Sequence, residues 1–527
     1  MLNSLLVYVP LSIIGLWRWS YWLVRIIGAA LYRPPATPWP ANKKQLSLSI
    51  VTPVYNESEP LFDQAMDSWI ANGVDEIIAV IDKSNAPLIV EFEKKYTNRS
   101  DVRCQLVVTP KIGKRSALCD GVNRAQGDLI AFVDSDTVWG EDVRKKALPY
   151  FLDQKVGGVT VAQRIMNPHS LSNVLFDILL WTRYHEEVPF LLGLGKAFNT
   201  LSGRTAIYRR EALINDTHDN LHQLRHEFFF GTRGISGDDK RLSHLILEQG
   251  WHVGYVKDAV VYTEGLDKMR VFLRQRLRWI RNSWRADLRA IKRGWIWRHP
   301  VLAYFIIDRF IQPFFMLLGP TACAIAIIQR RWLIVEVLVA WWLISRTVRL
   351  SSYFRHYPKR IIYLPFYIIY SYINALIKIY ALGTLLEHSW ATRWHKSRLR
   401  KGLLRRSLVM ATGTTAVAAV LFMAGHLINQ INKEAAATIP RPTPVAQNEF
   451  NLLVATAQNA PPAPVLPAKV ILPTAVKTYV TKPGDSFTEL ASRFGMSVKS
   501  LKKLNGISNT QNVNAGSTIL YYDLPAK

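Results

Sequence analysis

Asp134 and Asp136 form a pair of carboxylates placed to bind a cation. They follow the apolar run 129–133, which reads LIAFV and is typical of a buried strand. Side chains two apart on an extended segment point to the same side, and Mg²⁺ commonly binds one or two carboxylates together with substrate phosphates. After such a strand, the pair predicts a divalent-cation site. In isolation, the same pattern is commonly a solvated turn.

Asp238 and Asp239 are adjacent carboxylates that follow Gly237. Neighbouring side chains point in different directions, so only one of them needs to face a substrate. A carboxylate beside an acceptor hydroxyl can act as a general base, and an aspartate at a helix start can cap free N–H groups. We expect one of the two to take each role, with the capped helix at 240–249.

Two basic stretches complement these acids. Gly113, Lys114 and Arg115 open a predicted helix, where backbone N–H groups and two cations make an anion site; a helix start with exposed charges is the alternative. In the segment QRLRW, Arg278 and Trp279 are suited to holding a diphosphate and stacking on a ring. Taken singly, each is also typical of a membrane interface.

Alternating strands and helices are expected to position these residues. The runs predicted as strands are 46–53, 76–81, 102–108 and 129–133, and the helical patterns between them include 61–71 and 114–124. This alternation predicts a doubly wound α/β sheet. Ligands of such sheets bind beyond the carboxyl ends of the strands, where Asp82 and the pair Asp134 and Asp136 fall.

Composition points to a membrane rather than to nucleic acid. The net charge is +27, and basic residues cluster beside apolar segments, as in 393–406. That placement follows the positive-inside rule, and such clusters also attract anionic lipid. The three cysteines have no metal-ligand spacing, so neither a zinc site nor a disulfide framework is expected.

Apolar segments bracket the α/β region. We interpret 2–17 as an uncleaved anchor rather than a cleaved signal peptide, and 18–32 as an interfacial helix. The segment 281–293 has the pattern of a basic membrane-surface helix. The later apolar segments are 301–328, 331–350, 361–387 and 407–428. If all of them crossed, the basic segments 355–360 and 393–406 would lie on opposite sides, so we interpret 361–387 as re-entrant or interfacial and expect about four spans.

The ordered motifs resemble those of processive family 2 glycosyltransferases, which include the cellulose, chitin and hyaluronan synthases and the alginate (mannuronan) polymerase. They are 51–57 (VTPVYNE), Asp82, 113–115 (GKR), 134–136 (DSD), 202–204 (SGR), 237–239 (GDD) and 275–279 (QRLRW). SGR, 375–380 (ALIKIY) and 389–393 (SWATR) favour the alginate polymerase. The single short N-terminal span and the C-terminal appendage depart from these relatives.

The resemblance implies a GT-A fold, an inverting transfer from a nucleotide-diphosphate sugar and extrusion through the membrane part. It implies that the donor and acceptor contact Pro53, Tyr55, Glu57, Asp82, Lys114, Arg115, Asp134, Arg204, Gln275, Arg278 and Trp279. Tyr55 and Asp82 would contact the base, with Asp239 as catalytic base beside Asp238. Asp136 and Asp134 would bind Mg²⁺ or Mn²⁺. Arg204 is suited to a uronate carboxylate, or equally to packing on a neighbouring acid.

The C-terminal segment resembles a LysM module, a βααβ fold that binds glycans containing N-acetylglucosamine, usually peptidoglycan. The resemblance rests on 479–486 (YVTKPGDS), 494–495 (FG), 504–506 (LNG) and 516–520. The glycan-binding residues that it implies are Gly484, Asp485, Ser486, Asn505 and Gly506. A structural cap that binds nothing is the alternative.

Five regions are therefore expected: 1–44 as anchor and interfacial helix, 45–295 as glycosyltransferase domain, 296–430 as transmembrane and interfacial helices, 431–476 as Pro/Ala-rich linker, and 477–527 as LysM. We expect a multi-pass protein of a bacterial inner membrane, with the catalytic domain cytoplasmic and LysM periplasmic or extracellular. The predicted function is processive synthesis and extrusion of an exopolysaccharide from a GDP- or UDP-linked sugar, most like alginate or hyaluronan synthase. The alternatives are a non-processive transferase to a lipid carrier and an inactive wall-anchored scaffold. Besides lipid, product and peptidoglycan, we allow for a periplasmic or membrane partner subunit, but not for nucleic acid.

Overall fold

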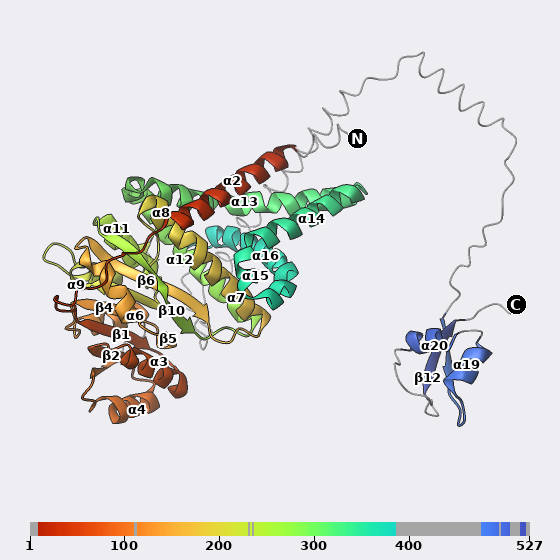
Figure 1. Cartoon of the computed structure of the whole chain (residues 1–527), viewed down its shortest axis with the longest axis horizontal. Helices are drawn as coiled ribbons and strands as arrows, with labels where there is room; N and C mark the ends of the chain where they lie inside the picture. The colour runs from red at the N-terminus through yellow and green to blue at the C-terminus, as the bar shows by residue number, and fades with distance from the viewer. Residues whose placement is uncertain are drawn as a thin grey trace, which may run out of the picture. The chain divides into compact units, whose positions relative to one another are not determined.

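The computed structural model (Figure 1) divides into two compact units, 1–439 and 440–527, which are described separately. The residues that it describes are 9–109, 113–229, 232–233, 237–385, 476–494, 497–505 and 517–522. Residues 431–475 of the predicted linker 431–476 lie outside them, as do the apolar segment 407–428, the basic cluster 393–406 and Gly506.

An eight-stranded mixed sheet forms the centre of the first unit. Its strands in spatial order are β3 (Arg103–Thr109), β2 (Glu76–Asp82), β1 (Leu48–Val54), β4 (Leu129–Val133), β7 (Thr205–Arg209), β6 (Val156–Ile165), β10 (His252–Thr263) and β5 (Thr137–Trp139). The first four are parallel, whereas β7 is antiparallel to both of its neighbours. The four predicted strands are confirmed within two residues. The sheet is not purely parallel, because β7 and β5 run against their neighbours.

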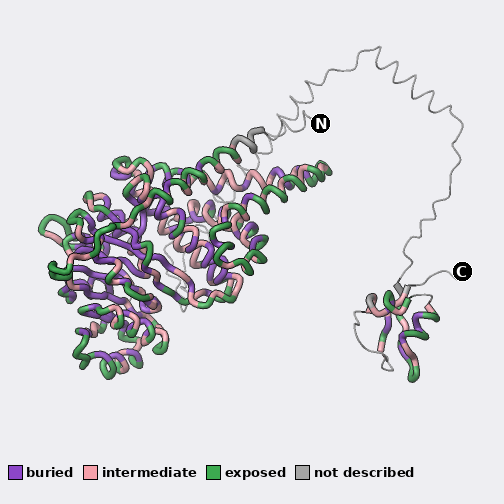
Figure 2. Tube along the Cα trace, viewed as in Figure 1, coloured by how far each residue is buried: buried purple, intermediate pink, exposed green. Residues whose placement is uncertain are grey.

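Apolar side chains on both faces of the sheet explain why its central strands are continuously hydrophobic. Helices α3 (Glu59–Ala71) and α4 (Ala86–Tyr96) pack on one face, where Phe62 and Trp69 meet Ile77. Helix α5 (Lys114–Val122) packs on the other, where Leu118 meets Ile78. Figure 2 shows the strands buried and the outer helices exposed.

Shorter elements complete the α/β region. They are α6 (Val143–Ala147), the 3₁₀ helix η1 (Leu148–Leu152), α7 (Leu171–Thr182), the π-helical turn η2 (Arg183–Glu187), α8 (Val188–Gly195), α9 (Arg210–Leu213), α10 (Asn220–Arg225), β8 (Phe228–Phe229), β9 (Thr232–Arg233) and α11 (Asp238–Glu248). The parallel strands β1, β2 and β4 end at the same edge of the sheet, near the start of α11. This edge positions the predicted site.

The helices that follow pack on that edge. They are α12 (Met269–Arg293), the 3₁₀ helix η3 (Trp295–Arg298), α13 (Pro300–Ile328), α14 (Trp332–Arg349), α15 (Ser351–His356), the 3₁₀ helix η4 (Pro358–Tyr363) and α16 (Leu364–Gly383). The expectation of a membrane-surface helix at 281–293 is wrong. Trp284 and Asp287 are buried, and the Arg281 Nε atom donates to Thr384 Oγ1 at 2.8 Å. Arg281 and Arg285 of α12 therefore belong to the interior of the protein.

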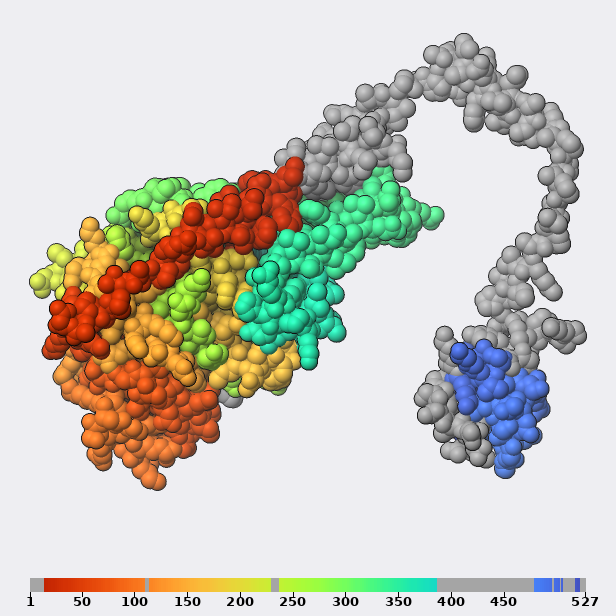
Figure 3. Space-filling model, in the orientation of Figure 1, coloured from red at the N-terminus to blue at the C-terminus, as the bar shows by residue number. Residues whose placement is uncertain are grey.

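Residues 9–31 form one helix, α2 (Val9–Leu31), which lies on the outside of the unit in Figure 3. It packs against α8 through glycines, since a Cβ atom at Gly193 would lie 2.1 Å from the carbonyl oxygen of Gly28. Within the described part of the chain, two helical segments are long and apolar enough to cross a membrane, Pro300–Ile328 and Pro358–Gly383. The second overlaps 361–387, for which the re-entrant or interfacial interpretation stays a prediction. α14 is not among them, because it carries Glu336, Arg346 and Arg349.

The second unit is a small α+β module, as predicted. Its elements are β11 (Val476–Val480), α19 (Phe487–Arg493), α20 (Val498–Leu504) and β12 (Thr518–Tyr522), with the two strands antiparallel. Phe487, Leu490, Leu501 and Ile519 form its core.

Candidate active site

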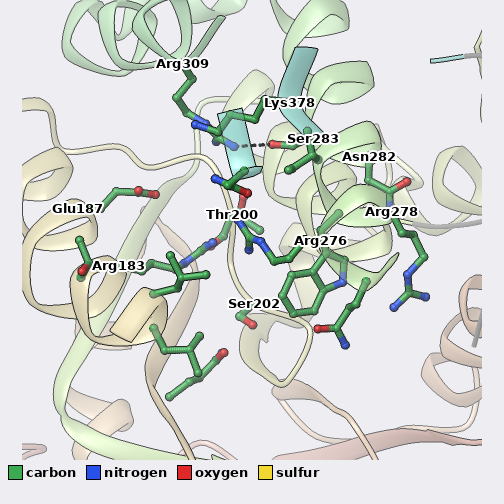
Figure 4. Close-up of a pocket in the computed structure, with 18 of the residues that line it drawn as sticks. Arg183, Glu187, Thr200, Ser202, Arg276, Arg278, Asn282, Ser283, Arg309 and Lys378 are labelled. Carbon is green, nitrogen blue, oxygen red and sulfur yellow. Dashed lines mark hydrogen bonds between the residues drawn. The ribbon is translucent and has the colours of Figure 1, made fainter. Parts of the chain in front are cut away.

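The edge of the sheet opens into a cavity of about 1370 Å³. Its catalytic end is lined by Pro53, Tyr55, Glu57, Asp82, Lys114, Asp134, Asp136, Arg204, Asp238, Asp239, Gln275, Arg278 and Trp279. Every residue predicted for the catalytic, metal and donor sites, except Arg115, therefore borders one space. Figure 4 shows part of this space between the α/β region and the later helices.

Lys114 connects the two pairs of aspartates. Its Nζ atom lies 2.6 Å from Asp134 Oδ1 and 3.1 Å from Asp238 Oδ2. Gly113, at the N-cap of α5 with φ of 148°, lets the chain enter the helix in this orientation. Gly203 keeps the space open, because a Cβ atom there would lie 2.9 Å from Lys114 Nζ. The SGR motif thus packs directly on the charged centre.

Arg115 does not face the cavity, which corrects its predicted position near a diphosphate. Its Nη1 atom lies 2.5 Å from Glu227 Oε2, and its Nη2 atom donates to the carbonyl oxygen of Gly237 at 3.2 Å. Burial lowers the pKa of Arg115 despite the nearby charges of Asp238 and Asp239. Its position next to Gly237 orients the start of α11 rather than a ligand.

Asp238 and Asp239 occupy the first turn of α11, where the helix dipole favours negative charge. Gly237 (φ of 84°) is the N-cap, and Asp239 Oδ1 accepts from the backbone N–H of Lys240 at 2.7 Å, so one of the two aspartates satisfies an N–H group of the first turn, as expected. Burial and the adjacent charge of Asp238 raise the pKa of Asp239. Burial also opposes ionisation of Asp238, but Lys114 and Arg115 outweigh it and lower its pKa. The pKa values of the two carboxylates are therefore shifted in opposite directions, downward for Asp238 and upward for Asp239. Such a separation is typical of acid/base sites.

The ends of β1 and β2 border the opposite wall of the cavity. Asp82 is buried and accepts hydrogen bonds from the backbone N–H of Ser84 at 2.9 Å and from its hydroxyl at 2.5 Å. Glu57 Oε2 accepts from the Ser135 hydroxyl at 3.1 Å, which ties the first motif to the Asp134–Asp136 turn. Tyr55 and Pro53 line the cavity beside them. These residues form a polar rim of the kind that fixes a ligand's orientation.

Trp279 lies among cations and aromatic rings. Its ring centroid is 5.6 Å from that of Phe176, and the Arg204 guanidinium lies 5.6 Å from the Trp279 ring. Arg204 donates to Gln163 Oε1 at 3.3 Å and packs over Phe176 at 5.0 Å. Arg204 therefore packs on aromatic rings, and its predicted interaction with a uronate carboxylate or a neighbouring acid stays a prediction.

Gln275 and Arg278 direct polar atoms toward the cavity. The Gln275 Oε1 and Arg278 Nε atoms are buried and have no hydrogen-bond partner among the described residues. Burial lowers the pKa of Arg278, and the charges of Asp238, Asp134 and Asp239 oppose this effect. Such unsatisfied polar atoms are rare in folded proteins and indicate a ligand or water site.

Asp134 and Asp136 offer the carboxylate oxygens that a hard divalent cation prefers, but they do not form a complete set of ligands. No group of three or more His, Cys, Asp or Glu residues with metal-binding geometry occurs within the described ranges. Asp136 lines the cavity, and the nearby carboxylates of Asp134 and Asp238 already accept the cationic Lys114 between them. A hard cation bound by one or two carboxylates would complete its coordination with phosphate oxygens.

A buried polar cluster beneath α11 was not predicted from the sequence. Lys240 Nζ lies 2.6 Å from Asp287 Oδ1 and donates to the Ser283 hydroxyl at 2.7 Å. Burial lowers the pKa of Lys240 to about 8, although Asp287 opposes this shift. Asp287 is the single acid in the otherwise basic α12, and that isolation is the signal that could have identified it.

Four of the five predicted glycan-binding residues of the second unit, Gly484, Asp485, Ser486 and Asn505, lie within the described residues, and each has a structural role. Gly484 has φ of 99° in a turn where Asp485 Oδ2 accepts from the backbone N–H of Lys482 at 2.7 Å. The Ser486 hydroxyl caps α19 by accepting from the N–H of Glu489 at 3.3 Å. The Asn505 amide contacts Leu501 and Leu520 through three hydrogen bonds of 2.7–2.9 Å. Asn505 thus holds α20 to β12, so its amide is already occupied.

Residues 47–282 match the family model described as "Glycosyltransferase like family 2". The chain carries a glycosyltransferase domain of family 2. Its α/β sheet is accordingly GT-A-like, and the prediction of a glycosyltransferase enzyme is confirmed. Residues 479–520 of the second unit match the model described as "LysM domain".

Curated relatives carry related names. An N-acetylglucosaminyltransferase of Rhizobium sp. (strain N33) is 29% identical over 392 residues, which cover 69% of this chain and 82% of the relative. A type 2 glycosyltransferase of Zymoseptoria tritici is 23% identical over 406 residues, covering 73% and 85%. Among solved structures, the mannosyltransferase PcManGT from Pyrobaculum calidifontis in complex with GDP-Man and Mn²⁺ aligns with a TM-score of 0.45 at 17% identity. This alignment covers 71% of this chain and 99% of that protein.

Proposed function

We propose that this protein is a membrane-embedded, processive, inverting glycosyltransferase that polymerises a polysaccharide and passes it between its helices. The observation that carries the proposal is the extent of the cavity. The same 1370 Å³ space that borders Asp239 and Trp279 is also lined by Asp308 of α13, Trp341 of α14 and Lys378 of α16. A growing chain needs such a path, whereas a single transfer needs space for one acceptor only.

Asp239 is the proposed catalytic base. Its carboxylate accepts the proton of the acceptor hydroxyl, and that oxygen attacks the anomeric carbon of the donor sugar. The bond from this carbon to the diphosphate oxygen breaks, and its electrons leave with the diphosphate, so one displacement inverts the configuration. A carboxylate whose pKa is raised by burial is a better base than an ordinary aspartate.

The departing diphosphate develops negative charge beside fixed cations. Lys114 and Arg278 line the cavity and are the proposed groups that stabilise it. Asp136 and Asp134 would hold Mg²⁺ or Mn²⁺, which when bound supplies further neutralisation of the diphosphate. Tyr55 and Asp82 would orient the nucleotide base of a GDP- or UDP-linked donor.

Trp279 and Gln275 are the proposed floor for the acceptor sugar. An indole ring stacks on the apolar face of a pyranose, and the buried Gln275 Oε1 atom has no partner in the described part of the chain, so it is available to a sugar hydroxyl. We propose a product most like alginate or hyaluronan, which contain uronic acids. The relatives named N-acetylglucosaminyltransferases make an amino sugar the competing donor.

The proposed location is a bacterial inner membrane, with the glycosyltransferase domain cytoplasmic. In the part of the chain that the structure describes, two segments are long and apolar enough to cross, which supports membrane association. The LysM module would then lie outside the cytoplasm and bind peptidoglycan, through residues other than the engaged amide of Asn505.

The test is sugar incorporation by the purified full-length protein in detergent. The donors are GDP-mannuronate, UDP-glucuronate with UDP-N-acetylglucosamine, UDP-N-acetylglucosamine alone and UDP-glucose, with Asp239→Asn as the inactive variant and Lys359→Met as a matched exposed control. The proposal predicts a long polymer from one donor set, abolished by Asp239→Asn alone. Short lipid-linked products, or no transfer from any donor by a folded protein, would contradict it in favour of a lipid-carrier transferase or a scaffold.

A further inference from the structure

The cavity becomes strongly cationic beyond Trp279. The basic residues that line it there include Arg183, Arg276, Arg309, Arg346, Arg349 and Lys378. The carboxylates that the surrounding helices contribute to the same lining are Glu186, Glu187 and Asp308. A passage for an uncharged polysaccharide does not require this excess of basic over acidic side chains.

Two of these three carboxylates are already paired. Asp308 forms an ion pair with Arg18, and Glu186 lies 3.8 Å from Arg25. Among the described residues, no carboxylate lies within ion-pair distance of Arg276, Arg309 or Lys378. These three cations therefore form no ion pair among the described residues, and the carboxylates that act on Lys378, Glu187 and Asp308, do so from beyond ion-pair distance.

The hydrogen bonds of the three cations go to neutral groups. Arg309 Nη2 donates to the Ser283 hydroxyl at 3.1 Å, as Figure 4 shows, and Lys378 Nζ donates to Gln312 Oε1 at 2.8 Å. The Arg276 guanidinium lies 6.0 Å from the ring of Trp279, and its buried Nε atom has no partner in the described part of the chain. The neutral partners orient the cations without cancelling their charge.

The positions of the three residues are mutually close and follow the proposed acceptor site. Arg276 lies one helical turn before Trp279 on α12. The Arg309 guanidinium lies 5.9 Å from the ring of Trp284, whose Nε1 atom donates to the carbonyl oxygen of Lys378 at 3.0 Å. Arg309 lies on α13 and Lys378 on α16, and both helices belong to described segments that are long and apolar enough to cross a membrane. Unpaired charges in such segments are costly and mark a substrate path.

We infer that Arg276, Arg309 and Lys378 form a carboxylate-binding subsite for the elongating chain, so that the polymer carries uronic acid residues. The inference rests on the proposed processive function. A carboxylate arriving from the polymer supplies the missing counter-charge, and charge-assisted hydrogen bonds are stronger than those of neutral sugars. N-acetylglucosamine, the sugar in the relatives' names, carries no such charge.

Binding of defined oligosaccharides tests this subsite without requiring catalysis. Tryptophan fluorescence of the full-length protein in detergent reports the affinity for a hexasaccharide of mannuronate, for the same hexasaccharide with its carboxyls reduced to alcohols, and for chitohexaose. We expect the mannuronate hexasaccharide to bind at least about tenfold more tightly than either neutral probe. We also expect this preference to weaken with added salt.

Charge variants identify the residues. Lys378→Met and Arg309→Met are expected to remove most of the preference, whereas Arg309→Lys keeps the charge and is expected to retain much of it. Lys359→Met, at an exposed position outside the cavity, is the control, and an unchanged melting temperature shows that each variant folds. Equal affinity for the charged and reduced hexasaccharides, or a preference unchanged in both Met variants, would overturn the inference.

The two proposals fail in different ways. A long polymer made only from neutral donors, with no preference for the charged probe, refutes the subsite and leaves the processive function standing. Preferential binding of the charged probe by a protein that makes only short products supports the subsite and refutes processive synthesis.

Discussion

The ion pair between Lys240 and Asp287 predicts a large and pH-dependent loss of stability in Asp287→Asn. The Nζ and Oδ1 atoms are 2.6 Å apart, and the two side chains are 5% and 0% exposed. The substitution keeps the shape of the side chain but leaves a buried ammonium that has lost its charged partner. Removing one partner of a buried pair typically costs about 3–5 kcal/mol of unfolding free energy.

Lys240 can avoid a buried, unpaired charge by losing its proton. The free energy of that deprotonation is therefore the largest loss of unfolding free energy that the variant can show. An unfolded lysine has a pKa of about 10.4, and each pKa unit corresponds to about 1.36 kcal/mol. Deprotonating the Lys240 ammonium at pH 7 therefore costs roughly 4.6 kcal/mol. At pH 9 the same cost falls to roughly 1.9 kcal/mol. A lysine whose native pKa is below its unfolded pKa binds fewer protons when folded, so the unfolding free energy rises with pH between the two values. The variant should therefore recover stability as the pH rises from 7 to 9.

Thermal unfolding of the full-length protein in detergent, followed by tryptophan fluorescence, measures the effect. For a domain of this size, the expected penalty at pH 7 lowers the melting temperature by roughly 6–20 °C. The double variant Lys240→Met/Asp287→Leu removes both charges and should lose much less, since apolar replacement of a buried pair is often neutral. Lys95→Met, which breaks an exposed ion pair, is the control. A melting temperature of Asp287→Asn within about 1 °C of the native protein, or a double variant as unstable as the single, would refute this reasoning.

Three further predictions concern the site and the LysM module. Gly203→Ala should displace the flexible end of Lys114 and lower kcat at least about tenfold with an unchanged melting temperature; unchanged kinetics would contradict the packing. Asp238→Asn should lower the pKa of Asp239 by removing a repelling charge, so that the acid limb of the kcat/KM profile moves to lower pH; a limb that moves upward would exclude Asp239 as the base. Asn505→Ala removes two hydrogen bonds to Leu520 of β12 and one to Leu501 of α20 and should destabilise the module by about 2–4 kcal/mol. Faster cleavage of the C-terminal unit in limited proteolysis of the full chain would show this, and unchanged cleavage would contradict it.

The sequence predicted the parts of the fold whose local patterns are unambiguous. The strands β1 to β4 are apolar runs bounded by turns, and the ligand-facing aspartates follow directly from where those runs end. Strands β5, β6, β7 and β10 were not predicted, because their pairing is set by contacts distant in sequence, such as that of β7 with both β4 and β6.

Charge alone misplaced several residues. Arg115 and Arg281 were assigned to a ligand site and a membrane surface from their composition, but Glu227 and Thr384, both distant in sequence, hold them inside the protein. Partners that are remote in sequence determine these outcomes, and a single sequence does not reveal them.

The most direct test of the central claim is the length of the product at very low conversion. Purified protein is given limiting labelled donor, so that most molecules have completed few transfers on average, and the products are separated by size-exclusion chromatography. Processive synthesis through the cavity between Asp239 and α16 predicts long chains from the earliest time point beside unused acceptor. Short products that lengthen uniformly with time would contradict the account.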